Sequence, residues 1–287
     1  MIKKIYSRIL TTIREIRRSI TVYSRFLSSY RRNTPPRISS VLCGVGLYYW
    51  DETDNLGDYL SHVICSHLSK DLGIAEASFS GRVLYAIGSI LGFIRQDAIV
   101  WGSGILSPDW SYRLYIKHSN LDIRAVRGPK TAKVLRSVGK NVPAVFGDPA
   151  ILMPYVYQPA QQDKKYPVSF IPHFSDKTPL SPNIHRIEIQ TRNYQSVINQ
   201  IAASELVISS SLHGIILAET YGVPAVLLLH DYQNSFKYED WYLSTGRTCT
   251  YARTFEEALH MQPLPLPELA DMQQKLLDAF PRDMWNH

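Results

Sequence analysis

Apolar and polar positions alternate along the chain in a pattern that predicts strands and helices in turn. Short apolar runs predict strands over residues 41–47, 97–101, 122–126, 143–146, 168–171, 185–189, 206–209 and 225–229. Longer stretches predict helices over residues 58–72, 130–138, 194–203, 214–221 and 267–280. This alternation predicts an α/β protein with doubly wound, parallel sheets.

Two proline-rich stretches divide this pattern. Residues 154–167 contain three prolines and several polar residues, so we expect a boundary there. It separates an N-terminal α/β domain over residues 35–157 from a C-terminal α/β domain over residues 165–262. A second joint has prolines at every other position from 263 to 267 and begins a C-terminal helical segment, 263–287. The predicted architecture is two Rossmann-like domains that face a cleft.

The first 32 residues have a pattern of their own. Large apolar residues recur at spacings of three or four from Ile2 to Tyr30, which is one stripe of an α-helix. Nine basic residues and one acid give this segment a charge of +8, whereas the whole chain carries +6. We therefore expect a basic amphipathic helix over residues 1–34 that anchors the chain to an anionic membrane surface. A helix packed on its own domain or on a dimer partner, or a transit peptide, would share this pattern.

Composition narrows the classes of function. Beyond residue 32 the charge sums to −2, so we expect no nucleic-acid partner. Three cysteines without a CxxC pair indicate neither a disulfide framework nor a zinc ribbon, and they suit a reducing cytoplasm. We expect no metal site. No apolar run is long enough to span a bilayer, and neither a P-loop nor a nucleophile elbow occurs.

Two groups of residues in the first domain are suited to ligand binding. Asn55 and Asp58 flank the entry to a predicted helix, where an amide and a carboxylate can face the cleft; either residue alone would also serve as a helix cap. Gly102, Ser103 and Gly104 end a predicted strand, where small residues let the backbone approach a ligand. The third glycine of a dinucleotide-binding fingerprint is missing, so we do not expect NAD.

Two further groups carry cationic or titratable side chains. Arg127 lies at a helix start, where arginine binds phosphate or carboxylate in bidentate fashion or pairs with a surface acid. Ser210, Ser211, Leu212 and His213 lie between a strand and a helix. Exposed N–H groups, hydroxyls and an imidazole there make an anion pocket. His213 is a candidate general acid, with a purely structural histidine as the alternative.

The motifs occur in an order that is typical of one family. They are Asn55-Leu-Gly-Asp58, Gly102-Ser-Gly104, Ala125-Val-Arg-Gly-Pro129, Gly147-Asp-Pro149, Ser211-Leu-His-Gly214 and Tyr221-Gly-Val-Pro224. As an ordered set they resemble the polysaccharide pyruvyltransferases, and most of all the bacterial exopolysaccharide type that forms pyruvate ketals. The resemblance implies a two-domain fold like that of the GT-B glycosyltransferases. It also implies phosphoenolpyruvate as donor, no cofactor, and a ketal formed across two hydroxyls of a sugar.

The same resemblance implies roles for individual residues. Arg127 would bind the phosphate or carboxylate of phosphoenolpyruvate, and His213 would contact the phosphate and donate a proton. Asn55 and Asp58 would lie toward the acceptor sugar, with Asp58 as the candidate base. The acceptor would be a lipid-linked oligosaccharide of an exopolysaccharide or capsule. The enzyme would then work in the cytoplasm, peripherally on the inner face of the membrane.

One position departs from the family pattern. Many relatives have arginine where this chain has Ser211, so a cation that would neutralise the donor is missing; Lys237, Arg247 or His173 could replace it. Retaining two-domain glycosyltransferases carry a carboxylate eight residues before the one that matches Glu219, and Ser211 is not a carboxylate. A nucleotide-sugar glycosyltransferase and a non-catalytic assembly module of a polysaccharide machine remain the alternatives.

Overall fold

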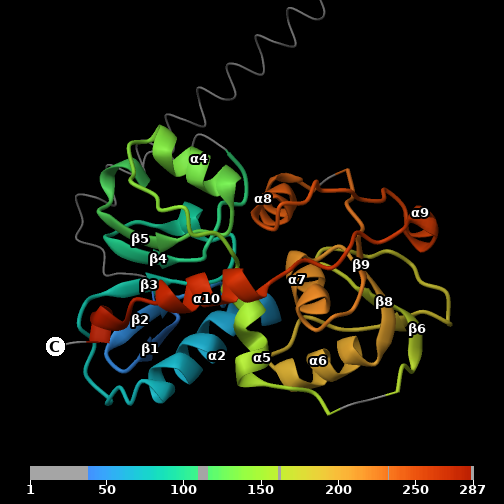
Figure 1. Cartoon of the computed structure of the whole chain (residues 1–287), viewed down its shortest axis with the longest axis horizontal. Helices are drawn as coiled ribbons and strands as arrows, with labels where there is room; N and C mark the ends of the chain where they lie inside the picture. The colour runs from blue at the N-terminus through green and yellow to red at the C-terminus, as the bar shows by residue number, and fades with distance from the viewer. Residues whose placement is uncertain (1–37, 109–115, 161–162, 232, 286–287) are drawn as a thin grey trace, which may run out of the picture.

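The computed structural model describes residues 38–108, 116–160, 163–231 and 233–285. The basic helix expected over residues 1–34 lies outside this part of the chain. Two sheets lie side by side, and each forms the centre of one half of the molecule (Figure 1). Strands that are mostly parallel and that alternate with helices confirm the predicted α/β class.

In the described residues the first sheet has five strands in the order β1-β2-β3-β4-β5. They are β1 (Ser40–Leu42), β2 (Val45–Tyr48), β3 (Val83–Tyr85), β4 (Ala98–Trp101) and β5 (Leu121–Ala125). β1 and β2 are antiparallel, and the other neighbours are parallel. The connecting helices are α2 (Leu56–Asp71), the short η1 (Leu91–Phe93) and, after β5, α4 (Pro129–Ser137).

The second sheet has four parallel strands within the described ranges, in the order β7-β6-β8-β9. They are β6 (Tyr166–Ile171), β7 (His185–Arg186), β8 (Ser204–Ser209) and β9 (Ala225–Leu227), with α6 (Tyr194–Ala202) and α7 (Leu212–Thr220) between them. The turn η2 (Pro149–Leu152) and the short α5 (Met153–Val156) lead into this half from the first. The chain then forms α8 (Phe236–Ser244), α9 (Phe255–His260), α10 (Ala270–Asp278) and η3 (Arg282–Trp285).

Several predicted elements differ from those observed. The run over residues 41–47 is a hairpin, because Cys43 and Gly44 both have positive φ, 46° and 84°, and make a two-residue turn. The strand predicted over 143–146 is only a bridge between Phe146 and Val126, and the one over 185–189 shortens to β7. β3, α5, α8 and α9 were not predicted.

Helix α7 joins the two halves. All its residues from Leu212 to Glu219 are buried, and it packs on η2 as well as on β8 and β9. A helix that is apolar on all sides is typical of a core position. One hydrophobic cluster accordingly runs from the first half, with Val45 and Leu56, into the second, with Ile215 and Leu227.

The C-terminal segment returns to the first sheet, with α10 in front of it in Figure 1. The indole N–H of Trp101 donates to the carbonyl oxygen of Leu276 at 2.8 Å. The indole N–H of Trp285 donates to the carbonyl oxygen of Leu42 at 3.0 Å. This segment therefore contributes to the core of the first half. Among the described helices, none combines the length and the apolar character needed to cross a membrane.

Candidate active site

A cavity of about 620 Å³ lies between the two halves. It is lined by Trp50, Asn55, Asp58, Ser89, Ile90, Phe93, Leu106, Ser107, His173, Phe174, Ser175, Ile189, Gln190, Ser211, Leu212, His213, Gln233, Asn234 and Lys237. The predicted site residues in its wall are Asn55, Asp58, His173, Ser211, Leu212, His213 and Lys237. Residues far apart in sequence thus meet at one cavity.

Asp58 is the carboxylate in the cavity wall. It lies in the first turn of α2, and Asn55 at the N-cap donates its side-chain amide to Asp58 Oδ2 instead of capping the helix. Burial raises the pKa of Asp58 to about 6, although the positive charges of His213 and Lys237 oppose this rise. A carboxylate with this pKa is largely ionised at pH 7 and is basic enough to accept a proton.

His213, in the first turn of α7, contributes its imidazole to the wall. The ring packs against Gly57 so closely that a Cβ there would lie 1.8 Å from Nδ1. Nε2 lies 3.6 Å from Oδ2 of Asp148. Both atoms are buried, and neither has a hydrogen-bond partner among the described residues. Asp148 therefore faces Nε2, while Gly57 packs against the Nδ1 edge of the ring, so contacts from both sides fix the orientation of the imidazole.

Asp148 was not predicted as a site residue. It is fully buried, and its Oδ1 accepts a hydrogen bond from the backbone N–H of Ala150 at 3.0 Å, which caps η2. The available signal was its position in Gly147-Asp-Pro149, after an apolar run. Its nearness to His213 depends on the packing of α7 against η2, which no local pattern predicts.

Lys237 projects from α8 into the cavity wall. Burial, and after it the charge of Arg127, lower the pKa of Lys237 to about 8, while Asp58 opposes the change. None of the carboxylates in the described ranges forms an ion pair with its ammonium group; its neighbour is the Tyr238 ring, 4.9 Å from Nζ to the ring centre. Lys237 is therefore a half-buried cation in the cavity wall and is suited to an anionic ligand.

The N-terminus of α7 adds to this positive end of the cavity. Ser211 is the N-cap in extended conformation, and its side chain makes no capping bond. The first N–H groups of a helix need acceptors and favour an anion. With Lys237 and His213 beside them, these groups form what we call the anion site: the α7 N-terminus, His213 and Lys237.

Arg127 does not line the cavity. Its guanidinium is fully buried and donates to the Asp240 carboxylate at 3.2 Å, to the Ser89 hydroxyl at 2.7 Å and to the Ile105 carbonyl at 2.7 Å. Gly104 lies against it, because a Cβ there would be 2.3 Å from Cζ. The position predicted for a donor-binding arginine is thus one side chain behind the wall that Ser89 forms.

The other small residues at the end of β4 also contact protein. Gly102 has φ +93°, and a Cβ there would lie 2.2 Å from Cδ of Pro149. Ser103 is fully buried. These residues and Gly104 let the backbone approach Pro149 and Arg127, and none of the three lines the cavity.

Lys237 is one of three residues that could replace the missing arginine, and the other two, Arg247 and His173, do not fill that role. Arg247 pairs with Glu219 through two bonds of 2.7 Å, and Trp241 donates to the same carboxylate at 3.1 Å, outside the cavity wall. His173 lines the cavity, but burial lowers its pKa to about 4, so it is neutral at pH 7. Lys237 is the member of this group that is charged and in the cavity.

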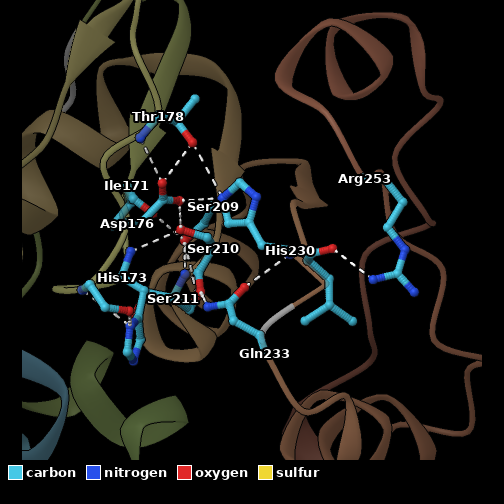
Figure 2. A network of polar contacts seen from close by, with 12 residues as sticks. Ile171, His173, Asp176, Thr178, Ser209, Ser210, Ser211, His230, Gln233 and Arg253 are labelled. Carbon is cyan, nitrogen blue, oxygen red and sulfur yellow. Dashed lines mark hydrogen bonds and ion pairs between the residues drawn. The ribbon is translucent and has the colours of Figure 1, made fainter.

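Figure 2 shows a polar network behind the anion site. The carboxylate of Asp176 accepts hydrogen bonds from the backbone N–H and the hydroxyl of Thr178, at 2.8 and 2.6 Å. It also accepts from the Ser210 hydroxyl and from Nε2 of His230. Burial alone would raise the pKa of Asp176, but bonds from Ser210 and Thr178 lower it. Ser210 is itself buried, so its role here is to fix the loop before α7.

The wall of the first half is partly aromatic. The Trp50 and Phe93 rings lie 5.6 Å apart, and Leu106 exposes apolar surface there, as Phe174 does on the wall of the second half. None of these was predicted, because an aromatic residue near a strand end looks like core in a single sequence. Within the described part of the chain, no cluster of three or more histidine, cysteine, aspartate or glutamate side chains is arranged to hold a metal.

Known proteins similar to this chain share part of its length. "Succinoglycan biosynthesis protein ExoV" of Rhizobium meliloti (strain 1021) is 32% identical over 219 residues, 70% of this chain and 65% of that protein. "Uncharacterized protein L143" of Acanthamoeba polyphaga mimivirus is 28% identical over 155 residues, 50% of this chain and 52% of that protein. Each match thus spans less than two thirds of the relative.

A solved structure of an uncharacterized protein from Klebsiella pneumoniae superposes on 70% of this chain and 88% of that chain, with 16% identity and a TM-score of 0.46. The sequence model of the family described as "Polysaccharide pyruvyl transferase" matches residues 55–232, from the N-cap of α2 to the loop before α8. Because that match covers more than half of the chain and includes most of the cavity wall, the chain belongs to the polysaccharide pyruvyl transferase family.

Proposed function

We propose that this chain transfers the pyruvyl unit of phosphoenolpyruvate onto two hydroxyls of a sugar, forming a pyruvate ketal in the cavity between the halves. One observation carries the proposal: a lysine without an ion pair in the described part of the chain, a histidine that faces a buried carboxylate, and a second carboxylate line one cavity beside a helix N-terminus. Membership of the family and the similarity to ExoV support it.

The donor fits the positive end of the cavity. Phosphoenolpyruvate carries a phosphate and a carboxylate, and charge-assisted hydrogen bonds to such groups are strong. Lys237 and the first N–H groups of α7 bind one of these anions, and His213 lies next to it. Arg127 acts from behind the wall, through its contact with Ser89 and its charge, without touching the donor.

The reaction uses His213 as acid and Asp58 as base. His213 gives a proton to the methylene carbon of phosphoenolpyruvate, which leaves an oxocarbenium-like centre at C2. A sugar hydroxyl attacks C2 and passes its proton to Asp58. The C2–O bond to phosphate then breaks, and the phosphate takes the proton from Asp58. The second hydroxyl attacks C2 and returns a proton to His213, so both groups are restored. General acid and general base catalysis each supply roughly 10²–10⁴-fold in rate.

The acceptor approaches from the other wall of the cavity. Asn55 orients Asp58 through its amide, and the Trp50 and Phe93 rings give an apolar surface for the sugar ring. We assign residues 35–157 to the acceptor side and residues 165–262 to the donor side of two Rossmann-like domains in a GT-B-like arrangement. The acceptor is a lipid-linked repeat unit of an exopolysaccharide or capsule, met in the cytoplasm at the inner face of the membrane.

A nucleotide-sugar glycosyltransferase fits the cavity less well. The carboxylate that would match the second glutamate of that motif, Glu219, is held by Arg247 and Trp241 and does not line the cavity. Its expected partner position, Ser211, has a hydroxyl in place of a carboxylate.

The test is thermal unfolding of the full chain with millimolar phosphoenolpyruvate, UDP or GDP. A ligand at 100 times its dissociation constant stabilises the folded state by roughly 2.7 kcal/mol, which a melting curve resolves. We expect stabilisation by phosphoenolpyruvate, a smaller stabilisation of Lys237→Gln, and full stabilisation of Lys133→Gln, which changes an exposed lysine on α4. Stabilisation by a nucleotide alone would support glycosyl transfer. No stabilisation by any of the three would favour the non-catalytic assembly module.

A further inference from the structure

Helix α4 receives its N-terminal cap from the other half of the molecule. Its own N-cap residue, Gly128, has no side chain. Instead, Oδ1 of Asp240, on α8, accepts hydrogen bonds from the backbone N–H groups of Lys130 and Thr131 at 2.9 and 3.0 Å. Gly128 permits this approach, because a Cβ there would lie 2.1 Å from the Asp240 carbonyl oxygen. Figure 1 shows α8 opposite the end of α4, as this contact requires.

The second oxygen of the same carboxylate is also bound to the first half. Oδ2 accepts from the Thr131 hydroxyl at 2.6 Å and from Nε of Arg127 at 3.2 Å. Asp240, Thr131 and Arg127 are all fully buried. Breaking such a pair leaves an uncompensated buried charge, which is strongly unfavourable. Asp240 therefore fastens α8 to the first half.

Lys237 is carried by the same helix. It precedes Asp240 by three residues, so the two side chains lie on neighbouring positions of one helix face. The ammonium group of Lys237 is in the cavity wall, where it interacts electrostatically with Asp58 and Arg127 of the first half. Where α8 sits relative to the first half thus determines where this cation sits in the cavity.

We propose that Asp240 is a positioning residue for donor binding: by capping α4 and pairing with Arg127 it holds Lys237 at the anion site. The inference rests on the proposed function for the identity of the donor. What it adds is a coupling between two properties: the contact of Asp240 with the first half, and the affinity of the anion site for its ligand. A residue that served only the stability of the fold would show no dependence on Lys237.

A double-mutant cycle tests this coupling. Phosphoenolpyruvate affinity is measured by calorimetry for the full chain and its Asp240→Asn, Lys237→Gln and doubly substituted variants. Asparagine keeps the size of the side chain and an acceptor for α4, but it loses the charge that Arg127 needs. We expect Asp240→Asn to weaken binding on the order of tenfold in the native background and less than about twofold in the Lys237→Gln background. In turnover assays the KM for the donor should rise more than kcat falls.

Two more variants keep the test decisive. Glu239→Gln removes the neighbouring ion pair between α8 and Lys130 of α4; because this pair is half-exposed and contributes little, the variant should weaken donor binding much less than Asp240→Asn does. Thr131→Val removes one donor to Asp240 and should weaken binding in the same direction, even if Asp240→Asn does not fold. Two results would overturn this inference but not the proposed function. One is that Asp240→Asn weakens donor binding equally with and without Lys237, and the other is that folded Asp240→Asn binds the donor with native affinity. Native affinity in Lys237→Gln would overturn the anion site as well, and no binding by the unmodified chain would overturn the proposed function.

Discussion

Lys237 and Asp58 have pKa values that lie on either side of neutrality, about 8 and about 6. Above pH 8 the Lys237 ammonium loses its proton and with it the attraction for an anionic donor. We therefore expect the affinity for phosphoenolpyruvate to fall by about tenfold per pH unit above pH 8. Below about pH 6, where Asp58 takes up a proton, kcat/KM should fall because the base is lost.

Lys237→Arg is the control for the alkaline side, since a guanidinium keeps its charge throughout this range. Its donor affinity should stay level between pH 7 and pH 9 in calorimetric titrations at constant ionic strength. Parallel losses in the lysine and arginine proteins would show that another group titrates.

Asp148 offers a second prediction for a single residue. Because its Oδ2 faces Nε2 of His213, Asp148→Asn replaces an acceptor by an amide that can donate to the ring. The imidazole then favours the wrong tautomer, and we expect kcat to fall on the order of 10²-fold or more. Donor affinity should change by less than about twofold, because neither the charge of Lys237 nor the α7 N-terminus is altered.

Steady-state kinetics of Asp148→Asn, His213→Ala and the double variant check this assignment. The double variant should be no slower than His213→Ala, since Asp148 acts through the histidine. A further loss of rate in the double variant would contradict the assignment and give Asp148 a role of its own.

Among the elements, those that begin with site residues were predictable. α2 and α7 each follow a buried strand and start at polar or small residues, Asn55 and Ser211, so a local pattern reveals both helix and site. His213 and Asp58, which both line the cavity, were predicted in this way. Their common cavity was expected because the carboxyl ends of parallel strands gather ligand-binding residues.

α8 was missed, although it carries Lys237 and Asp240. Its buried residues, among them Phe236, Tyr238 and Trp241, do not form one stripe with the 3.6-residue period. Part of what fixes this helix is the bond from Asp240 to α4, 110 residues away in sequence. β3 was missed for a related reason: three residues buried on both faces carry no alternation.

For the whole molecule, the arrangement of the two halves decides which predicted residues line the cavity. Arg127 has the residue type and local position of an anion binder, yet α8 of the other half supplies its carboxylate partner. Gly102 and Gly104 look like a ligand loop, yet they accommodate Pro149 and the Arg127 guanidinium. Contacts between distant segments thus separate the residues that line the cavity from those that are buried behind its wall.

The charge of the chain is divided unevenly, and this division predicts binding to an anionic membrane surface. Residues 1–32 carry a charge of +8, and the rest of the chain carries −2, which gives +6 for the whole chain. Each Lys or Arg near an anionic surface contributes about 1 kcal/mol to binding. We expect the full chain to float with phosphatidylglycerol vesicles at low salt, and to remain unbound on phosphatidylcholine or in high salt. Removal of residues 1–32 should abolish flotation, and Arg17→Glu with Arg18→Glu should weaken it. Flotation of the shortened chain would refute the anchor, whereas its turnover of a soluble acceptor should be unchanged.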